Sequence, residues 1–270
     1  MPISGGKRMR KKAAAFLAAI TLCWTLGSAA PASAYEGGAY HFGFKKSKGG
    51  QLPSIAEEGF MPILKKHEAI FLGNTAVKEL YLTFDNGYEN GYTGPILDVL
   101  KKKQVPAVFF VTGHYVKTEP QLLKRMADEG HLIGNHSWSH PDMTQVSSAQ
   151  IKEELDKVNQ EVAKLTNQPA MKFVRPPRGI FNDRVLEVSK QLGYTNVFWS
   201  IAYRDWETNL QRGADYAYTN VMNQLHPGAV ILLHSVSRDN AQALERIIDG
   251  ARGLGYEFKR LDSLDVKVYL

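Results

Sequence analysis

Short apolar runs alternate with longer amphipathic segments through the chain from residue 78 onward. Seven runs rich in β-branched, leucine and aromatic residues span 78–84, 106–112, 131–136, 172–176, 196–202, 229–235 and 256–261. Most of them are continuously apolar rather than alternating, which is typical of parallel strands that are covered on both faces. The pattern therefore predicts seven buried parallel strands.

The segments between these runs have the periodicity and the end signals of helices. Six helices are predicted at 93–104, 119–130, 147–166, 182–193, 215–225 and 240–255. Ser147 and Gln150 have capping-box spacing, and Asn182 and Gly193 suit the start and the end of a helix. This alternation predicts a single α/β domain built as a parallel barrel, closed or partly open, with a doubly wound sheet as the alternative.

The first 34 residues have the three parts of a secretory signal peptide. Five Lys and Arg residues lie within 7–12, an uncharged stretch rich in Ala and Leu follows, and Ala32-Ser33-Ala34 fits a cleavage site. The strongly apolar part is shorter than the roughly 20 residues that span a membrane, so we expect cleavage after Ala34 and export rather than anchoring. Residues 35–73 lack periodicity and predict an extended segment that packs on the barrel, which occupies 74–270.

Removing this leader changes what the charge and the cysteine count imply. The whole chain has a net charge of +6, with 33 basic and 27 acidic residues, but the leader holds five of the basic residues and none of the acidic ones. The near-neutral remainder gives no reason to expect nucleic-acid binding. Cys23 is the only cysteine, so the exported chain has neither a disulfide nor a thiolate nucleophile. Any metal must be held by His, carboxylate or amide groups.

Polar residues follow five of the seven predicted strands. They are Asp85, His136, Arg175, Asp205 and His234. Taken singly, each has an ordinary explanation: a turn, a surface cation, a helix cap or a satisfied buried histidine. Because the carboxyl ends of strands in an α/β barrel converge on one mouth, the set as a whole predicts a functional site.

Two histidines of this region are spaced i, i+4. His136 and His140 could face one cation if the segment is helical or coiled, although this spacing alone is a weak signal in a chain with eight histidines. The remaining histidines are interpreted as structural or surface residues, namely His41, His67, His114, His131 and His226.

Five ordered motifs give the chain a resemblance to a known family. They are TFDNG (83–87), HSWSH (136–140), RPPRG (175–179), RDW (204–206) and LLH (232–234). Over about residues 78–261 the chain resembles the polysaccharide deacetylase family (NodB homology domain, carbohydrate esterase family 4). The first motif is most similar to that of the sporulation-type peptidoglycan N-acetylmuramic acid deacetylases. The resemblance implies a deformed (β/α)7 barrel and metal-assisted removal of acetyl from an N-acetyl sugar.

The resemblance also implies a role for each motif residue. Asp85 would be the general base, held by Arg175, and His234 would be the general acid, oriented by Asp205. A divalent metal ion, zinc or similar, would be bound by His136, His140 and Asn86. Trp206 would form an apolar wall of the acetyl pocket, and the backbone N–H of Arg178 would help to bind the oxyanion. Amide hydrolysis needs such a base, acid and oxyanion donor.

Two positions depart from the usual family pattern. Asn86 replaces a metal-binding Asp, and its neutral amide predicts weaker metal binding. Arg178 stands where an aromatic residue is common. Since Arg pairs with carboxylates and muramic acid carries a lactyl carboxylate, we hypothesise that Arg178, with Arg204, selects muramic residues without a stem peptide.

The expected function is thus an exported de-N-acetylase acting on muramic acid in peptidoglycan, whose product closes to the δ-lactam of spore cortex. It would act in the cell wall or the forespore intermembrane space, after an amidase that removes stem peptides, with glycan strands as partner and no stable protein partner. The alternatives are an N-acetylglucosamine or chitooligosaccharide deacetylase, a catalytically impaired glycan-binding module, and an acetyl-xylan esterase.

Overall fold

The centre of the fold is a parallel sheet of seven strands. The computed structural model describes residues 38–48, 51–168 and 170–264. The strands of the sheet are β2 (Glu79–Asn86), β3 (Ala107–Val111), β4 (Leu132–Asn135), β5 (Phe173–Val174), β7 (Thr195–Asn196), β8 (Ala229–His234) and β9 (Glu257–Phe258). Their order is β7-β5-β4-β3-β2-β8, and β9 also pairs with β2. Six of the seven predicted strands are confirmed in place; the predicted strand 196–202 shares only Asn196 with β7, and beyond it the segment forms isolated bridges at Val197 and Ile201.

The sheet curls until its two ends meet. The chain that leaves β7 returns to β8, where Ser200 N–H donates to Val230 O at 2.9 Å and Leu232 N–H donates to Ile201 O at 2.9 Å. These bonds close the sheet into a deformed barrel, and the short strands β5 and β7 account for the deformation. The doubly wound alternative is therefore wrong.

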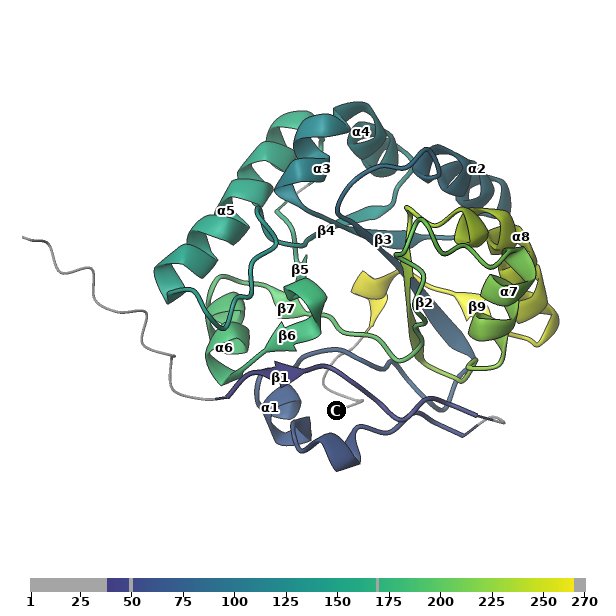
Figure 1. Cartoon of the computed structure of the whole chain (residues 1–270), viewed down its shortest axis with the longest axis horizontal. Helices are drawn as coiled ribbons and strands as arrows, with labels where there is room; N and C mark the ends of the chain where they lie inside the picture. Colours follow the sequence, from purple (N-terminus) through teal and green to yellow (C-terminus); the bar gives the residue numbers. More distant parts are fainter. Residues whose placement is uncertain (1–37, 49–50, 169, 265–270) are drawn as a thin grey trace, which may run out of the picture. The chain divides into compact units, whose positions relative to one another are not determined.

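The helices lie around the outside of the strands (Figure 1). The six predicted helices are confirmed as α2 (Thr93–Lys103), α4 (Pro120–Asp128), α5 (Ser148–Leu165), α6 (Asp183–Gln191), α7 (Ala214–Met222) and α8 (Arg238–Gly253). The capping box of Ser147 and Gln150 forms, and the Asn182 side chain accepts a hydrogen bond from Val185 N–H. A further helix, α3 (Gly113–Thr118), was not predicted because six residues are too few to show a helical period.

The region before β2 is less extended than we expected. It contains β1 (Tyr40–His41), a 3₁₀ turn η1 (Ala56–Glu58) and helix α1 (Met61–Lys66), so the prediction of an extended segment is wrong for α1. Strand β1 pairs antiparallel with β6 (Ile180–Phe181), and the Phe42 ring stacks on Phe198 at 4.5 Å. The predicted signal peptide, with Cys23 and the cleavage site after Ala34, lies outside the described residues. Within the described ranges, none of the helices has the length and apolar character that crossing a membrane requires.

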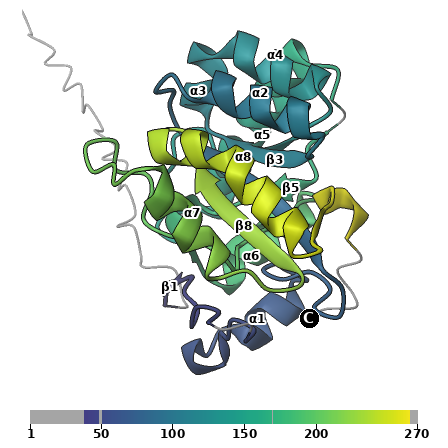
Figure 2. The ribbon, with the colours of Figure 1, turned by 90° about the vertical axis from the view of Figure 1, so that its right-hand side faces the viewer.

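Side chains of β2 alternate between two apolar regions, and this alternation determines where the polar ones point. Phe84 packs in the large cluster that includes helix residues, whereas Tyr81 packs with Phe110 in a smaller cluster. Because successive side chains of a strand point to opposite faces, Thr83 and Asp85 lie on the same face as Tyr81. Figure 2 shows the β8 arrow pointing toward the side on which the loop between β7 and α7 projects. The polar ends of the strands are on this side.

Candidate functional site

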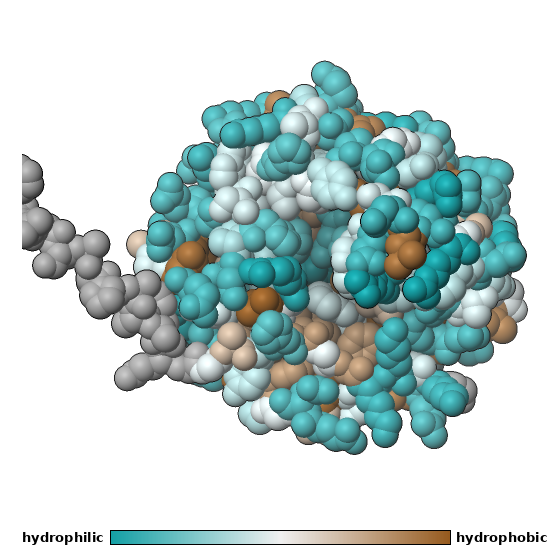
Figure 3. All heavy atoms as spheres, in the orientation of Figure 1, coloured by the Kyte–Doolittle hydropathy of each residue, from teal (hydrophilic) through white to brown (hydrophobic). Residues whose placement is uncertain are grey.

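The carboxyl ends of neighbouring strands bring the predicted site residues together. Asp85 on β2 is in register with His234 on β8, while His136 directly follows β4 and Arg175 directly follows β5. The Asp85 carboxylate lies 2.7 Å from Arg175 Nη1 and 3.6 Å from His136 Nε2. Figure 3, in the orientation of Figure 1, shows a mostly hydrophilic surface, with single apolar groups and several that lie together below the centre of the view.

Arg175 is held inside the barrel by several hydrogen bonds as well as by Asp85. The residue is fully buried, and its Nε donates to Val197 O at 3.0 Å. Its Nη2 donates to Thr83 Oγ1 at 2.9 Å and to Phe198 O at 3.2 Å. A guanidinium with this many bonds has one orientation, so it fixes Asp85 in turn.

The neighbours of Asp85 keep its carboxylate ionised. Burial favours the neutral acid, but the charge of Arg175, the charge of His234 and the hydrogen bond from Arg175 outweigh it. As a result, the pKa of Asp85 is lowered from its ordinary value of 3.8. The carboxylate is thus available to accept a proton at neutral pH.

His136 and His140 face each other across a tight loop, not along a helix. Their ring centroids are 4.9 Å apart, and the loop contains left-handed backbone at Ser137 (φ 64°) and His140 (φ 58°). Non-glycine residues adopt this conformation at a cost of order 1–3 kcal/mol, and such strain concentrates at functional sites. The i, i+4 spacing therefore brings the rings together by an irregular turn.

Both imidazoles are neutral at neutral pH, and the orientation of His136 suits a metal ligand. The Nδ1–H of His136 donates to Arg175 O at 2.8 Å, which leaves the Nε2 lone pair toward the site. Burial lowers the pKa of His136. The pKa of His140 is also lowered, mainly by partial burial of its ring and then by the nearby His136. The residue as a whole is still exposed.

Asn86 supplies the only further donor that we expected for a metal. Its side chain is fully buried, and its Nδ2 donates to Ser235 Oγ at 2.6 Å. Its Oδ1 has no hydrogen-bond partner among the described residues. Over the same residues, no group of three His, Cys, Asp or Glu side chains is arranged to hold a metal ion. The residues present thus fit a divalent ion with two imidazoles and one neutral amide oxygen, a donor set without charge.

His234 and Asp205 form the second polar pair of the mouth. Asp205 Oδ1 accepts the Nδ1–H of His234 at 2.7 Å, and Asp205 Oδ2 accepts the backbone N–H of His234 at 2.8 Å. Burial opposes the charged imidazole, but the charge and hydrogen bond of Asp205 and the charge of Asp85 outweigh it and raise the pKa of His234. The Trp206 ring packs edge-on to His234 at 5.5 Å and is 49% exposed. This pair holds a proton at the mouth, beside an apolar surface.

The two arginines proposed for substrate selection differ in their contacts. Arg204 pairs with Glu207, and its guanidinium is therefore already engaged. Arg178 is exposed and lies in the 3₁₀ turn η2 (Pro177–Gly179) with left-handed φ of 57°. Gly179 N–H makes the first hydrogen bond of this turn, to Pro176 O at 3.0 Å, so the preceding N–H of Arg178 has no acceptor within the turn. Within the described residues Arg178 thus has no ion pair, whereas Arg204 has one, in an exposed pair with Glu207.

Four buried polar residues support the site without having been singled out in the sequence. They are Thr83, Tyr203, Ser235 and Asn240. Thr83 lies two residues before Asp85, on the same face of β2, and Ser235 directly follows His234. Their positions next to the motif residues could therefore have indicated both. Tyr203 and Asn240 are ordinary residue types, and no pattern in the sequence marks them.

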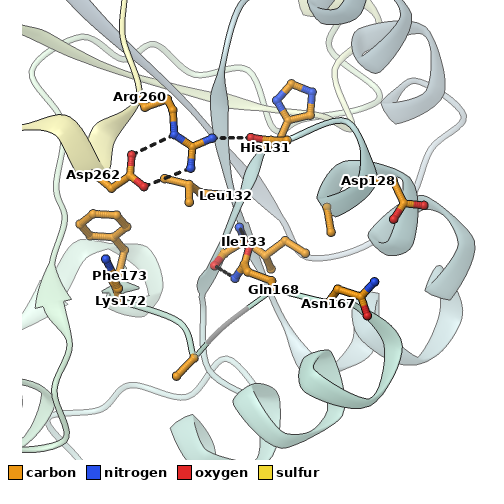
Figure 4. A pocket seen from close by; sticks show the side chains of 13 residues that line it. Asp128, His131, Leu132, Ile133, Asn167, Gln168, Lys172, Phe173, Arg260 and Asp262 are labelled. Atoms are coloured by element: carbon orange, nitrogen blue, oxygen red, sulfur yellow. Dashed lines mark hydrogen bonds and ion pairs between the residues drawn. The ribbon is translucent and has the colours of Figure 1, made fainter.

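A separate cavity lies at the opposite ends of the strands (Figure 4). It has a volume of about 310 Å³ and is lined by residues at the amino ends of β4 and β5 together with Arg260 and Asp262, which form an ion pair at 3.0 Å. His131, expected to be structural or at the surface, also lines it; the residue is buried, packs against Phe109 at 5.4 Å, and has its pKa lowered to about 4 by burial. This cavity is not part of the mouth.

A base and an acid placed on neighbouring strands suit a hydrolase. Comparisons with known proteins point to the same class of enzyme. Residues 72–197 match the family model for polysaccharide deacetylase. Over 238 residues the chain is 52% identical to the peptidoglycan-N-acetylmuramic acid deacetylase PdaA of Bacillus subtilis, covering 88% of this chain and 90% of that protein. It is 34% identical over 205 residues to a peptidoglycan-N-acetylglucosamine deacetylase of Bacillus cereus, covering 74% and 73%.

A solved structure extends the comparison to the fold. The structure of Bacillus subtilis PdaA, a family 4 carbohydrate esterase, matches with a TM-score of 0.82 and 53% identity, covering 84% of this chain and 96% of that chain. The chain therefore belongs to the polysaccharide deacetylase family, carbohydrate esterase family 4, and is a hydrolase of amide bonds.

Proposed function

We propose that this hydrolase is a peptidoglycan deacetylase that removes the acetyl group of N-acetylmuramic acid residues lacking a stem peptide. The observation that carries the proposal is the register of Asp85 with His234, which places an ionised carboxylate and a protonated imidazole on adjacent strand ends. The name of the 52% identical relative, a muramic acid deacetylase, supports the substrate, and the relative named for glucosamine is less similar.

The mechanism uses each polar pair for one proton transfer. Asp85, kept ionised by Arg175, takes a proton from the attacking water, and the Nε2–H of His234 protonates the departing amine while Asp205 holds Nδ1–H. We propose that the backbone N–H of Arg178 donates to the oxyanion and that Trp206, which packs against His234, bounds the side of the acetyl group.

Members of the family are generally metalloenzymes. We propose that His136, His140 and Asn86 hold the ion, zinc or similar. When bound, such an ion supplies Lewis acidity to the acetyl carbonyl and lowers the pKa of a bound water.

Arg178 is the proposed recognition group for the lactyl carboxylate. It is exposed, and within the described residues its guanidinium has no ion pair, in contrast to that of Arg204. A stem peptide converts the lactyl carboxylate into an amide, so only a peptide-free residue presents the charge that Arg178 can bind in a bidentate manner.

Arg178→Ala should therefore reduce the preference for muramic over glucosamine residues. Loss of a hydrogen bond to a charged group predicts a fall of about tenfold or more in the ratio of the two kcat/KM values. The ratio is measured by acetate release from defined glycans of each kind. Arg204→Ala serves as the matched control and should leave the ratio within about twofold; an unchanged ratio in Arg178→Ala contradicts the proposed recognition.

Asn86→Asp should strengthen metal binding, because it adds a negative charge to a neutral donor set. We expect the dissociation constant for Zn²⁺ to fall by about tenfold or more, as measured by calorimetry on the metal-free protein. Asn167→Asp, beside the separate cavity of Figure 4, adds the same charge at an exposed position away from the mouth and should not change the affinity. Equal affinities of wild type and Asn86→Asp would remove Asn86 from the donor set.

The pH dependence of kcat/KM follows from the three titrating groups. Asp85 and His140 must be unprotonated, and both have pKa values below their ordinary 3.8 and 6.5. His234 must be protonated, and its pKa lies above 6.5. As the pH increases, kcat/KM should thus rise at pH values below 6.5 and fall only at pH values above 6.5. An alkaline limb centred below pH 6.5 would exclude His234 as the acid.

The cellular part of the proposal follows from the substrate. We infer an exported enzyme that acts in the cell wall or the forespore intermembrane space, after an amidase has removed the stem peptide. The amine released on muramic acid can close onto its lactyl group to give the δ-lactam of spore cortex. Glycan strands are the expected partner.

One assay tests the proposed function against its alternatives. Purified protein is incubated with peptide-free peptidoglycan strands, with and without chelator, and the products are identified by mass spectrometry. We expect deacetylated muramic residues, loss of activity under chelation, and recovery when divalent metal is restored. Deacetylated glucosamine alone would favour the glucosamine or chitooligosaccharide alternative, and no release with any divalent ion would favour the glycan-binding module that neutral Asn86 leaves open.

A further inference from the structure

The Asp205 carboxylate has a hydrogen-bond donor that comes from helix α8. Asp205 is 4% exposed, and its only ion-pair partner within the described ranges is His234. Besides the two bonds from His234, its Oδ2 accepts the side-chain amide of Asn240 at 2.5 Å. Asn240 is the third residue of α8, so the positive end of that helix also lies near the carboxylate.

The amide of Asn240 has a single allowed orientation. Its Nδ2 donates to both Asp205 Oδ2 and the backbone carbonyl of His234, the latter at 3.2 Å, and its Oδ1 accepts the hydroxyl of Tyr203. Asn240 is 1% exposed, and its backbone N–H donates to Ser237 Oγ at 3.2 Å. Turning the amide over would place its oxygen against two acceptors, and this would leave a buried carboxylate without its donor.

Tyr203 is suited to hold this orientation. It is 6% exposed, and burial raises the pKa of its hydroxyl, so the hydroxyl stays protonated and donates. Its position two residues before Asp205 connects the loop after β7 to the start of α8. Four side chains thus form one hydrogen-bonded series, Tyr203–Asn240–Asp205–His234.

We propose that Asn240 is a positioning residue for His234, which acts through Asp205, and that Tyr203 keeps Asn240 in the required orientation. The proposal rests on the proposed function, in which His234 protonates the leaving amine. With Asn240 fixing Oδ2, Oδ1 faces His234 Nδ1, and the imidazole presents its Nε2–H to the substrate. Without Asn240, Oδ2 keeps only the bond from the backbone N–H of His234, so the carboxylate is held less firmly and the ring is less well directed.

A purely structural role for Asn240 has a different kinetic consequence. An amine leaving group needs a proton from the acid, whereas 4-nitrophenyl acetate releases a phenolate that needs none. Loss of acid positioning therefore affects amide hydrolysis selectively. Loss of structure lowers the hydrolysis of both substrates together.

The test compares the two substrates in Asn240→Ala and Tyr203→Phe. Asn240→Ala should lower kcat on an N-acetylated glycan by about tenfold or more with little change in KM, and lower ester hydrolysis by less than about twofold. Tyr203→Phe, which conserves the ring, should show the same selectivity with a smaller loss and carries the test if Asn240→Ala does not fold. Asn196→Ala is the matched control, since Asn196 is a buried residue whose amide donates to Leu186 O; it should show no selectivity. Equal losses on both substrates, or no loss on the amide, overturn the proposal.

A second measurement needs no turnover, and it separates this proposal from the proposed function. The Nδ1–H of His234, observed by NMR, should exchange with water more slowly in wild type than in Asn240→Ala, because wild type holds Asp205 against it by one further hydrogen bond. If wild type cleaves neither substrate, the proposed function fails and this exchange rate still decides the role of Asn240. An unchanged exchange rate overturns the role.

Discussion

Asp85→Asn should lower kcat for acetate release by about 100- to 10,000-fold, because the variant has no base to take the proton from water. In wild type, Arg175 Nη1 donates to Asp85 Oδ1 at 2.7 Å. The Asn side chain of the variant keeps an oxygen that can accept this bond, so the local geometry is largely retained. The rate is measured under substrate saturation, at a temperature where circular dichroism shows the variant to be folded.

Asp98→Asn provides the matched control for this loss. Asp98 is an exposed residue of α2 that pairs with Arg125, so the chemical change is the same but lies outside the mouth. The control should keep wild-type activity. If Asp85→Asn kept more than about a tenth of the wild-type kcat, Asp85 would not be the base.

The second large effect is on stability. Arg175→Met should lower the free energy of unfolding by about 3–5 kcal/mol, because it leaves the buried Asp85 carboxylate without its counter-ion. The variant also loses the bonds to Thr83, Val197 and Phe198. Urea denaturation measures the change, and the double variant Asp85→Asn/Arg175→Met should lose less than the sum of the two single variants.

The loss of unfolding free energy in Arg175→Met depends on pH in one direction. The folded pKa of Asp85 lies below its ordinary value of 3.8, so the stability from the pair is present above pH 3.8 and disappears as the pH falls through the folded pKa. The difference between wild type and Arg175→Met should therefore shrink below about pH 4. A difference that is independent of pH, or an Arg175→Met protein as stable as wild type, would contradict a stabilising pair.

The strands and the polar strand ends could be predicted because both depend on local sequence. A continuous apolar run such as 106–112 has few alternatives to a covered strand, and β3 lies within it. Asp85 and His234 were marked by standing where such runs stop. Their pairing in register is known only from the structure, because neither the neighbours of a strand nor its register can be read from an apolar run.

The remaining features depend on contacts between segments that are distant in sequence, or on backbone that a pattern does not show. Asn240 reaches Asp205 across 35 residues, and both are common residue types. His136 and His140 meet through left-handed residues, a geometry that no periodicity reveals. The pair of Arg204 with Glu207 is short-range, and the spacing of the two residues permits it without requiring it. Local sequence specifies the residue types of the site, and tertiary contacts decide which of them are free.

Acetate release from two matched peptidoglycan preparations tests the central claim most directly. Strands from which an amidase has removed the stem peptides are compared with intact strands, for wild type and Asp85→Asn in the presence of divalent metal. We expect wild type to release acetate from muramic residues of the peptide-free strands, with little release from the intact strands and none above background by Asp85→Asn. Equal release from both preparations, or undiminished release by Asp85→Asn, would contradict the account.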